Sequence, residues 1–193
     1  MMNVRESLEV LSRVRGSDDV VITNQGSARI WPLVSQHPND FQYNPSTMGG
    51  AIPLALGVAI AQPNREVVVV SGDGALLMSL GSLVSVIGSG CQNLTIVVLE
   101  NGIYEVTGGQ QTPASGTALD FSTIASGVGF TNAHTFDDLA AWSHHAEVMF
   151  GAQGPRFVNL KVGPADRQDL QTPAEAAAEQ IHRFQTALAN HQV

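Results

Sequence analysis

Apolar and polar residues follow each other along the chain in two alternating patterns. Residues 4–15 carry apolar side chains at helical spacing between charged ones, which predicts an amphipathic helix. Residues 19–23 form a short apolar run that leads directly into the polar residues 24–27, as expected of a buried strand that ends in a turn. Residues 35–47 contain two prolines and show no periodicity, so a loop is expected there.

The central part of the chain is more uniformly apolar. Residues 48–61 mix small and aliphatic side chains so closely that no polar face remains, which predicts a helix buried on all sides. The VVVV block within residues 66–71 is typical of a central parallel strand. A helix is expected over residues 75–87 and a second buried strand over residues 94–99.

The alternation continues to the end of the chain. A long loop is expected over residues 107–117, helices over 121–126 and 136–150, a strand over 156–162 and an alanine-rich helix over 173–189. Strands that alternate with helices predict an α/β fold of three layers, in which helices cover both faces of a mostly parallel central sheet. Ligands of such sheets bind beyond the carboxyl ends of the strands, where the strand order reverses.

The length and composition limit the organisation of the chain. A chain of 193 residues has the size of one domain, so residues 1–193 are expected to form a single domain, with residues 165–193 as a C-terminal helical extension. Hydrophobic residues make up 44% of the chain and charged residues only 13%. This charge density is low for a soluble monomer, so a homodimer or a larger oligomer is expected.

The charges and the single cysteine exclude several classes of protein. Seventeen acidic and nine basic residues give a net charge of -8, and no basic stripe is present to meet a nucleic acid. Cys91 is the only cysteine, which rules out an internal disulfide and a cysteine-ligated iron–sulfur cluster or structural zinc site within one chain. The polar start is unlike a secretory signal and the longest apolar run is too short for a membrane span, so a cytoplasmic location is expected.

Polar residues end two of the predicted strands, as Gly72-Asp73-Gly74 and Asn101-Gly102. Glycines let backbone N–H groups approach an anion, and the helix that follows points its positive end at the same place. A carboxylate at Asp73 is compatible with an anion only if a cation lies between them, and Mg²⁺ prefers such oxygen ligands. Asn101 offers a second oxygen and the carbonyl of Ile103 a third. Taken alone, Gly72-Asp73-Gly74 is explained equally well by an aspartate that caps the following helix. The second motif, Asn101-Gly102, favours the metal site.

The two motifs and their spacing are similar to the thiamine diphosphate signature of the pyruvate-decarboxylase-like superfamily. Residues 46–57, Ser-Thr-Met-Gly-Gly-Ala-Ile-Pro-Leu-Ala-Leu-Gly, resemble the segment that precedes this signature in the family. Residues 101–110, Asn-Gly-Ile-Tyr-Glu-Val-Thr-Gly-Gly-Gln, look most like the sulfopyruvate and phosphonopyruvate decarboxylase branch. The likeness spans about residues 20 to 115 and concerns the domain that binds the diphosphate and the metal ion.

The resemblance implies that the chain binds thiamine diphosphate with Mg²⁺. The side chains of Asp73 and Asn101 and the carbonyl of Ile103 would hold the metal ion. Backbone N–H groups of Gly74 and Ala75 would approach the diphosphate, while Met48 would sit beneath the thiazolium, although core filling is the commoner role of methionine. The residues implied at the cofactor are Asn24, Ser27, Ser46, Met48, Gly72, Asp73, Gly74, Ala75, Asn101, Ile103 and Tyr104. Among them, Asn24 and Ser27 would hydrogen-bond the diphosphate, and the backbone near Ser46 the aminopyrimidine.

The family mechanism also needs a glutamate that protonates the pyrimidine ring, and this glutamate lies on a separate pyrimidine-binding domain. None of the eight glutamates of this chain is an obvious candidate, and Glu100 stands where the family commonly has a second asparagine. No catalytic residue is therefore assigned to this chain. The resemblance implies a subunit of a 2-oxo acid decarboxylase that is inactive alone, is completed by a separate pyrimidine-binding subunit and acts on a small 2-oxo acid through chemistry that belongs to the cofactor.

Other interpretations stay open. One is a different reaction of thiamine diphosphate, such as carboligation as in acetolactate synthase, and another is a non-catalytic cofactor-binding module. A dinucleotide-binding domain is less favoured because no GxGxxG motif follows any predicted strand. Arg29 is expected to form a surface ion pair rather than to meet a substrate, His37 to lie in a solvated loop, and His144 and His145 to lie on a helix surface.

Overall fold

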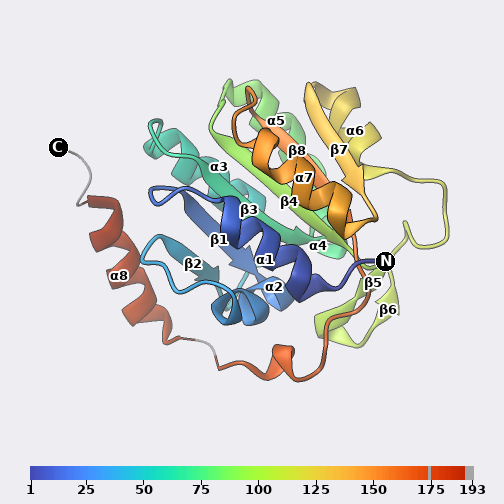
Figure 1. The fold of residues 1–193 in the computed structure, drawn as a ribbon, viewed down its shortest axis with the longest axis horizontal. Helices are drawn as coiled ribbons and strands as arrows, with labels where there is room; N and C mark the ends of the chain where they lie inside the picture. Colours follow the sequence, from blue (N-terminus) through green and yellow to red (C-terminus); the bar gives the residue numbers. More distant parts are fainter. Residues whose placement is uncertain (174, 190–193) are drawn as a thin grey trace.

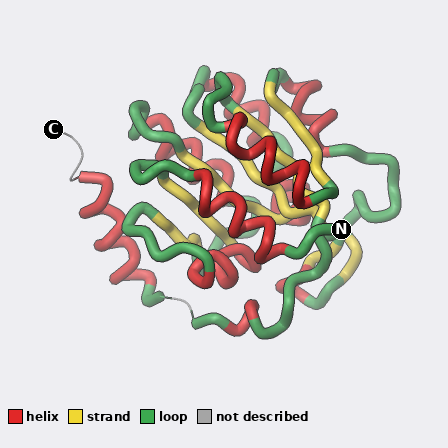
Figure 2. Tube along the Cα trace, in the orientation of Figure 1, coloured by secondary structure: helices red, strands yellow, loops and turns green. Residues whose placement is uncertain are grey.

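A computed structural model describes residues 1–173 and 175–189 as a six-stranded parallel sheet between two layers of helices (Figures 1 and 2). The strand order is β2-β1-β3-β4-β8-β7. The strands are β1 (Val20–Asn24), β2 (Asp40–Tyr43), β3 (Val67–Gly72), β4 (Leu94–Glu100), β7 (Asn132–Phe136) and β8 (Arg156–Lys161). The three-layer α/β fold expected from the alternation of strands and helices is confirmed.

The strand order reverses between β1 and β3. From β1 the chain moves outward to β2, whereas from β3 it moves to β4 on the other side. The four valines at the start of β3 are fully buried because β1 and β4 pair with this strand and helices cover both of its faces. Reversal points of this kind leave a crevice at the carboxyl ends of the strands, here the ends of β1 and β3.

Two sets of helices cover the sheet. On one face, the aliphatic residues of the sheet pack against α3 (Ala51–Ala61), α4 (Asp73–Met78), α5 (Ser82–Ser89), α6 (Phe121–Val128) and α8 (Ala177–Ala189). On the other face they pack against α1 (Val4–Val14), α2 (Gln25–Ile30), the 3₁₀ turn η1 (Trp31–Leu33) and α7 (Leu139–Met149). In the view of Figure 1, α1 and α7 lie in front of the sheet.

Both edge strands differ from the sequence-based predictions. The loop predicted over residues 35–47 contains β2, and the helix predicted over 136–150 begins only at Leu139, after the strand β7. In β2, buried and half-buried residues alternate over four positions only, and every residue of β7 is half-buried. Edge strands this short and polar lack the apolar run that identifies β3 and β4 in the sequence.

Two predicted helices and one predicted loop need correction. The helix predicted over residues 75–87 is two helices, α4 and α5, separated by a turn in which the N–H of Ser79 donates to the Leu76 carbonyl at 3.0 Å. The predicted loop 107–117 is partly ordered, because a small hairpin of β5 (Ile103–Tyr104) and β6 (Gln110–Gln111) encloses the 3₁₀ turn η2 (Glu105–Thr107). The helix of residues 48–61 is not buried on all sides, since Ile60 on α3 is 58% exposed.

A segment of residues 163–173, here called the strap, runs from β8 past α2 toward α8 along the lower edge in Figure 1 and includes the 3₁₀ turn η3 (Asp169–Gln171). The Ala165 N–H donates to Glu105 Oε1 at 2.7 Å, and Arg29 Nη1 donates to the Thr172 carbonyl at 2.9 Å. The helix predicted over 173–189 is α8, which begins at Ala177; residue 174 and residues 190–193 lie outside the described part. No helix among the described residues is long and apolar enough to cross a membrane.

Candidate functional site

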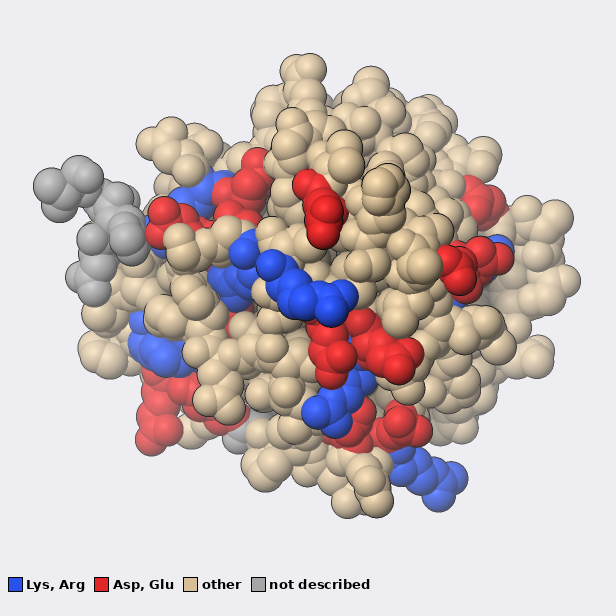
Figure 3. Space-filling view, viewed as in Figure 1, with Lys and Arg blue, Asp and Glu red and all other residues tan. Residues whose placement is uncertain are grey.

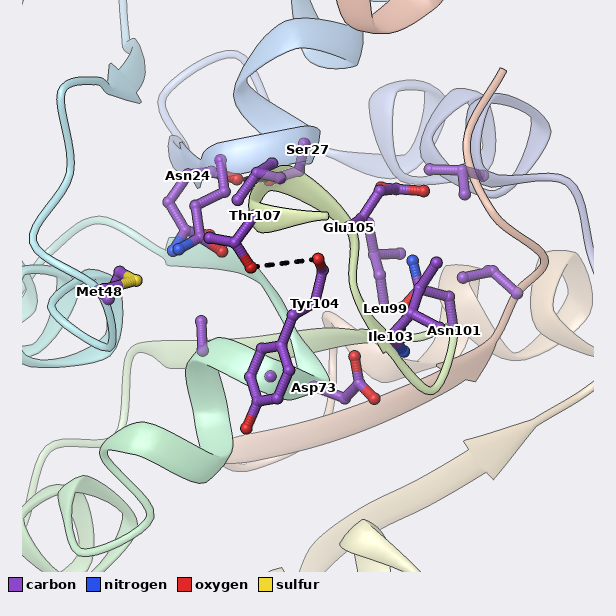
Figure 4. A pocket seen from close by; sticks show the side chains of 18 of the residues that line it. Asn24, Ser27, Met48, Asp73, Leu99, Asn101, Ile103, Tyr104, Glu105 and Thr107 are labelled. Atoms are coloured by element: carbon purple, nitrogen blue, oxygen red, sulfur yellow. Dashed lines mark hydrogen bonds between the residues drawn. The ribbon is translucent and has the colours of Figure 1, made fainter. Parts of the chain in front are cut away.

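A pocket lies at the carboxyl ends of β1, β3 and β4, where the strand order reverses (Figure 4). Its walls come from the turn between β1 and α2, the turn between β3 and α4, and the segment from β4 to η2. Ten of the residues expected at the cofactor line it: Asn24, Ser27, Met48, Gly72, Asp73, Gly74, Ala75, Asn101, Ile103 and Tyr104. The tertiary structure thus gathers these three segments, together with Met48 before α3, into one cavity.

Asp73 is the buried carboxylate of this pocket. Its side chain is 1% exposed, and its Oδ2 accepts hydrogen bonds from the Gly102 N–H at 3.1 Å and the Thr112 hydroxyl at 3.3 Å. Burial raises the pKa of the Asp73 carboxyl above its usual value, and the hydrogen bonds from Gly74, Gly102 and Thr112 partly counter this effect. A buried carboxylate held in this way is well suited to bind a cation, because the attraction of the cation would offset the free-energy cost of burying the charge.

Asn101 follows β4 and lies beside Asp73 in the close view (Figure 4). Its Oδ1 accepts a hydrogen bond from the Ile103 N–H at 3.1 Å, which makes a tight turn around Gly102. Gly102 has a φ of 75°, a conformation that favours glycine, and its carbonyl accepts from the Thr112 N–H at 2.9 Å. The β5–β6 hairpin therefore fixes the position of both predicted metal-binding side chains.

Tyr104 covers the first turn of α4. A Cβ atom added to Gly74 would lie only 2.6 Å from Cδ1 of the Tyr104 ring, so this position admits no side chain while the ring stays in place. The ring thus contacts the backbone of Gly74, where the diphosphate is predicted to bind. The sequence motif contains both residues, but only the fold shows that they touch.

Asn24 and Ser27 form the turn between β1 and α2 in different ways. The Ser27 hydroxyl accepts from the Asn24 N–H at 3.1 Å and lies 3.0 Å from the Val70 carbonyl, so it ties this turn to β3. Both amide atoms of the Asn24 side chain are buried without a hydrogen-bond partner. Buried polar groups normally have partners, so the Asn24 amide is free to bind a ligand, whereas the hydroxyl of Ser27 is already engaged.

Met48 and Ser46 precede α3. Met48 lines the pocket on the side away from Asn101 and is 55% exposed, so core filling does not explain this methionine (Figure 4). Ser46 is half-buried and does not line the pocket. The predicted contact of the Ser46 backbone with the aminopyrimidine is therefore not part of the cavity that this chain forms.

The charged side chains that line the pocket are acidic. Its charged lining residues are Asp73 and Glu105, with no lysine, arginine or histidine among them. A diphosphate therefore needs a cation to bind here, which agrees with the donor set of one carboxylate, one amide and backbone carbonyls. No group of three or more histidine, cysteine, aspartate or glutamate side chains in the described residues could hold a metal ion. The site accordingly fits Mg²⁺ shared with a diphosphate rather than a self-contained metal centre.

Two lining or supporting residues were not singled out by sequence reasoning. Thr112 donates to Asp73 from the far end of the hairpin, and Glu105 accepts from the strap. Glu105 lies inside the recognised motif, so its position in the sequence pointed to the site. Nothing in the sequence identified Thr112, since its role depends on the folding back of the hairpin.

The other candidate side chains lie elsewhere or hold structure together. Arg29 binds the strap instead of forming an ion pair, and His37 borders a different groove, 3.3 Å from the Arg15 guanidinium, where burial lowers the pKa of its imidazole. His145 is not merely on a helix surface, because its ring lies 4.4 Å from that of His134 on β7. None of these residues lines the pocket.

The sequence of the chain matches the family described as the thiamine pyrophosphate enzyme, C-terminal TPP binding domain, over residues 25–160. The chain belongs to this family, and thiamine diphosphate (the same compound) with Mg²⁺ is the cofactor typical of it. The resemblance stated from the motifs is thereby confirmed.

Two relatives and one solved structure show which members of the family the chain resembles. The chain is 35% identical to sulfopyruvate decarboxylase subunit beta of Methanothermobacter thermautotrophicus over 93% of both chains. It is 36% identical to phosphonopyruvate decarboxylase of Streptomyces viridochromogenes over 86% of this chain, but spans only 41% of that relative. An X-ray structure of an enzyme from Mycobacterium smegmatis, described as thiamin diphosphate-dependent, superposes with a TM-score of 0.72 and 27% identity over 84% of this chain and 32% of that one.

Proposed function

We propose that this chain is the diphosphate- and metal-binding subunit of a thiamine diphosphate-dependent 2-oxo acid decarboxylase. The observation that carries the proposal is the buried Asp73 carboxylate, which lies beside Asn101 at the strand-order reversal (Figure 4). Relatives named sulfopyruvate decarboxylase subunit beta and phosphonopyruvate decarboxylase support the decarboxylase reaction. Residues 1–193 would form one domain, with the segment from residue 165 as its C-terminal extension.

Nine of the residues that line the pocket have a role in this proposal. Asp73, Asn101 and the Ile103 carbonyl would hold Mg²⁺, and the backbone of Gly72, Gly74 and Ala75 would bind the diphosphate. The unpartnered Asn24 amide would hydrogen-bond the diphosphate from the other wall, while Ser27 would keep that turn tied to β3. Met48 would support the thiazolium from below. When bound, the cofactor would supply the carbon nucleophile that attacks the 2-oxo acid.

The pocket lacks a group that could complete the cofactor chemistry. The one glutamate that lines it, Glu105, accepts a hydrogen bond from the strap and lies on the hairpin next to the metal-binding residues. A separate pyrimidine-binding subunit would therefore supply the glutamate that activates the cofactor. The subunit name of the archaeal relative and the longer chain of the Streptomyces relative both support such a division.

The substrate would be a small 2-oxo acid with a second acidic group. Since no basic side chain of this chain lines the pocket, the partner subunit would also bind the acidic groups of the substrate. Carboligation, as in acetolactate synthase, is the competing reaction. Both reactions release carbon dioxide, and the organic product distinguishes them: a decarboxylase releases an aldehyde, whereas a carboligase of this kind joins two 2-oxo acids into one larger acid.

Calorimetric titration of the chain with thiamine diphosphate tests the metal-binding role of Asp73. Wild-type chain should bind the cofactor in the presence of Mg²⁺, and Asp73→Asn should weaken this binding at least about 100-fold, because a charge-assisted metal contact is lost. Glu147→Gln, an exposed carboxylate on α7, is the matched control and should bind normally. Equal affinity of wild type and Asp73→Asn in Mg²⁺ would contradict the proposal.

A second measurement tests the need for a partner. The purified chain with thiamine diphosphate and Mg²⁺ should release no carbon dioxide from sulfopyruvate, phosphonopyruvate or pyruvate. Turnover should appear only after addition of a pyrimidine-binding chain. Release of carbon dioxide by the chain alone would show that the activating group lies on this chain.

A further inference from the structure

A row of polar side chains crosses the sheet beside the pocket, at the carboxyl ends of β4, β8 and β7. Glu100 is the last residue of β4, and Asn159 and Thr135 lie near the ends of β8 and β7. The residues two positions earlier on each strand pack in the core on the face that α6 covers. Because side chains alternate along a strand, all three polar side chains lie on that same face. None of the three lines the pocket.

These side chains form one chain of hydrogen bonds. The Thr135 hydroxyl donates its proton to Asp120 Oδ2 at 3.0 Å, so its oxygen is left to accept from Asn159 Nδ2 at 3.4 Å. The same Asn159 nitrogen donates to Glu100 Oε2 at 2.5 Å. Asp120 in turn is the N-cap of α6. The Glu100 carboxylate is therefore held from the two neighbouring strands and, through them, from a helix.

Asn159 is fully buried, and the hydrogen bonds of the row determine how its amide is turned. The residue is 0% exposed, and its Oδ1 is buried without a hydrogen-bond partner. Buried polar atoms normally have partners, so the oxygen does not explain this orientation. The amide nitrogen does, because it faces a carboxylate and a hydroxyl that has given its proton away. Asn159 is thus placed to hold Glu100.

The Glu100 carboxylate has no basic partner in the described part of the chain. Around α1, by contrast, acidic and basic side chains lie side by side (Figure 3), and Arg5 pairs with Glu9 at 3.5 Å. Lys161 lies opposite Glu100 in the strand register, yet no ion pair joins the two. A glutamine would accept the same hydrogen bond from Asn159, so this bond does not explain why the side chain is charged.

The charge of Glu100 lies next to the proposed metal site. Glu100 directly precedes Asn101, and the Gly102 N–H donates to Asp73 Oδ2 at 3.1 Å. Burial is the main cause that raises the pKa of the Asp73 carboxyl, and the nearby charge of Glu100 raises it further. The two carboxylates therefore repel each other, whereas a cation held by Asp73 would be attracted by both.

We propose that Glu100 sets how strongly cofactor binding depends on the metal ion, and that Asn159 is the positioning residue for its carboxylate. The charge of Glu100 attracts a divalent cation to Asp73 and repels a diphosphate that arrives without one. Without this charge, the affinity for the metal ion should fall and the affinity for the diphosphate should rise. The inference rests on the proposed function and goes beyond it, because Glu100 stands where the family commonly has a second asparagine.

Calorimetric titrations of the full chain separate the two affinities. Glu100→Gln should need about tenfold more Mg²⁺ than the wild type for half-maximal binding of thiamine diphosphate. At saturating Mg²⁺ it should bind thiamine diphosphate at least as tightly as the wild type does. A damaged site would lose both affinities, so changes of opposite sign identify an effect of charge. Glu147→Gln, which removes an exposed carboxylate of α7, is the matched control and should change neither affinity.

Asn159→Ala tests the positioning role. It should raise the Mg²⁺ requirement of the wild type but not that of Glu100→Gln, because a neutral side chain has no charge to position. An increase of equal size in both backgrounds would overturn this role.

The outcome for Glu100 is distinct from that for the proposed function. A Glu100→Gln chain that keeps the wild-type Mg²⁺ requirement, or that loses both affinities, would overturn the inference and leave the metal-binding role of Asp73 intact. A wild type that binds no thiamine diphosphate with Mg²⁺ would overturn the proposed function and this inference with it. If the melting temperature shows that Glu100→Gln folds poorly, Glu100→Asn, with the residue common in the family, provides the same comparison.

Discussion

Gly74 and Tyr104 come from the ends of different strands, yet the ring of the tyrosine rests on the backbone of the glycine. This contact determines which residue position 74 tolerates. It also places an aromatic ring over the helix end that is proposed to bind the diphosphate. The cofactor site is therefore shaped by the Tyr104 ring of the hairpin and by the lack of a side chain at Gly74 on α4.

Substitution Gly74→Ala should destabilise the chain by about 1–3 kcal/mol, because the new methyl group would overlap the Tyr104 ring at 2.6 Å. The free energy of unfolding in urea measures this effect. In a Tyr104→Ala background the same substitution should cost less than about 0.5 kcal/mol, since the space is then open. An equal cost in both backgrounds would mean that the ring is not what excludes a side chain at position 74.

Asp73 shows how much of the role of a single residue could be predicted from the sequence. Its position after a valine-rich strand, with glycine on either side, predicted a carboxylate near an anion site with a cation between them; that it is buried is seen only in the structure. The partners that hold it, Gly102 and Thr112, depend on the hairpin after β4. Loop residues distant in sequence meet only when the chain folds back. The motif therefore pointed to Asp73 as a candidate metal-binding residue, but not to the residues that hydrogen-bond to it.

At the scale of elements, α6 shows how a single cap fixes a helix start. Burial alone would raise the pKa of Asp120, but hydrogen bonds from Ser122, the Thr123 N–H and Thr135 outweigh it and lower the pKa to about 2. A carboxyl whose pKa is lowered in the folded state stabilises that state above its unfolded pKa, and this contribution is lost as the pH falls through the folded value.

Asp120→Ala should therefore reduce the free energy of unfolding by about 1 kcal/mol at pH 7, the usual cost of losing a helix N-cap. The difference between variant and wild type should persist down to about pH 4 and shrink between pH 4 and pH 2. Urea titrations across this range measure it. Asp138→Ala, which removes the N-cap side chain of α7, provides a second cap variant for comparison. A difference for Asp120→Ala that stays constant to pH 2 would contradict the assigned protonation.

The elements found from sequence are those with a strong period or a long apolar run. The helix α1 and the strands β3, β4 and β8 lie where the pattern predicted them. The strands β2 and β7 were missed because their stability comes from pairing with β1 and β8, not from their own residues. The break between α4 and α5 was missed because both halves are apolar and no proline marks the turn.

At the scale of the whole molecule, α8 closes the sheet at the open edge of β2. Phe184 packs on Phe41 with ring centroids 5.0 Å apart and is 7% exposed, while the Gln180 side chain accepts a hydrogen bond from the Gln42 N–H. The helix thus covers an edge strand that would otherwise present unpaired backbone groups.

Phe184→Ala should lower the free energy of unfolding by about 3 kcal/mol and increase aggregation, because it leaves a cavity over β2. Chemical denaturation and light scattering measure the two effects. Ile181→Ala, at a position of the same helix that is 45% exposed, should cost less than about 1 kcal/mol. Equal effects of the two substitutions would show that α8 does not protect the sheet edge through Phe184.

The sequence by itself determined the class of fold, the place of the two polar strand ends and the family, because buried parallel strands and ligand-binding turns have local patterns. Only the tertiary structure decided which residues share the pocket, that Tyr104 covers Gly74, that the hydroxyl of Ser27 is engaged while the amide of Asn24 is free, and that α3 keeps an exposed apolar face. These properties depend on contacts between distant segments, and a local pattern carries no information about which distant segment will lie opposite.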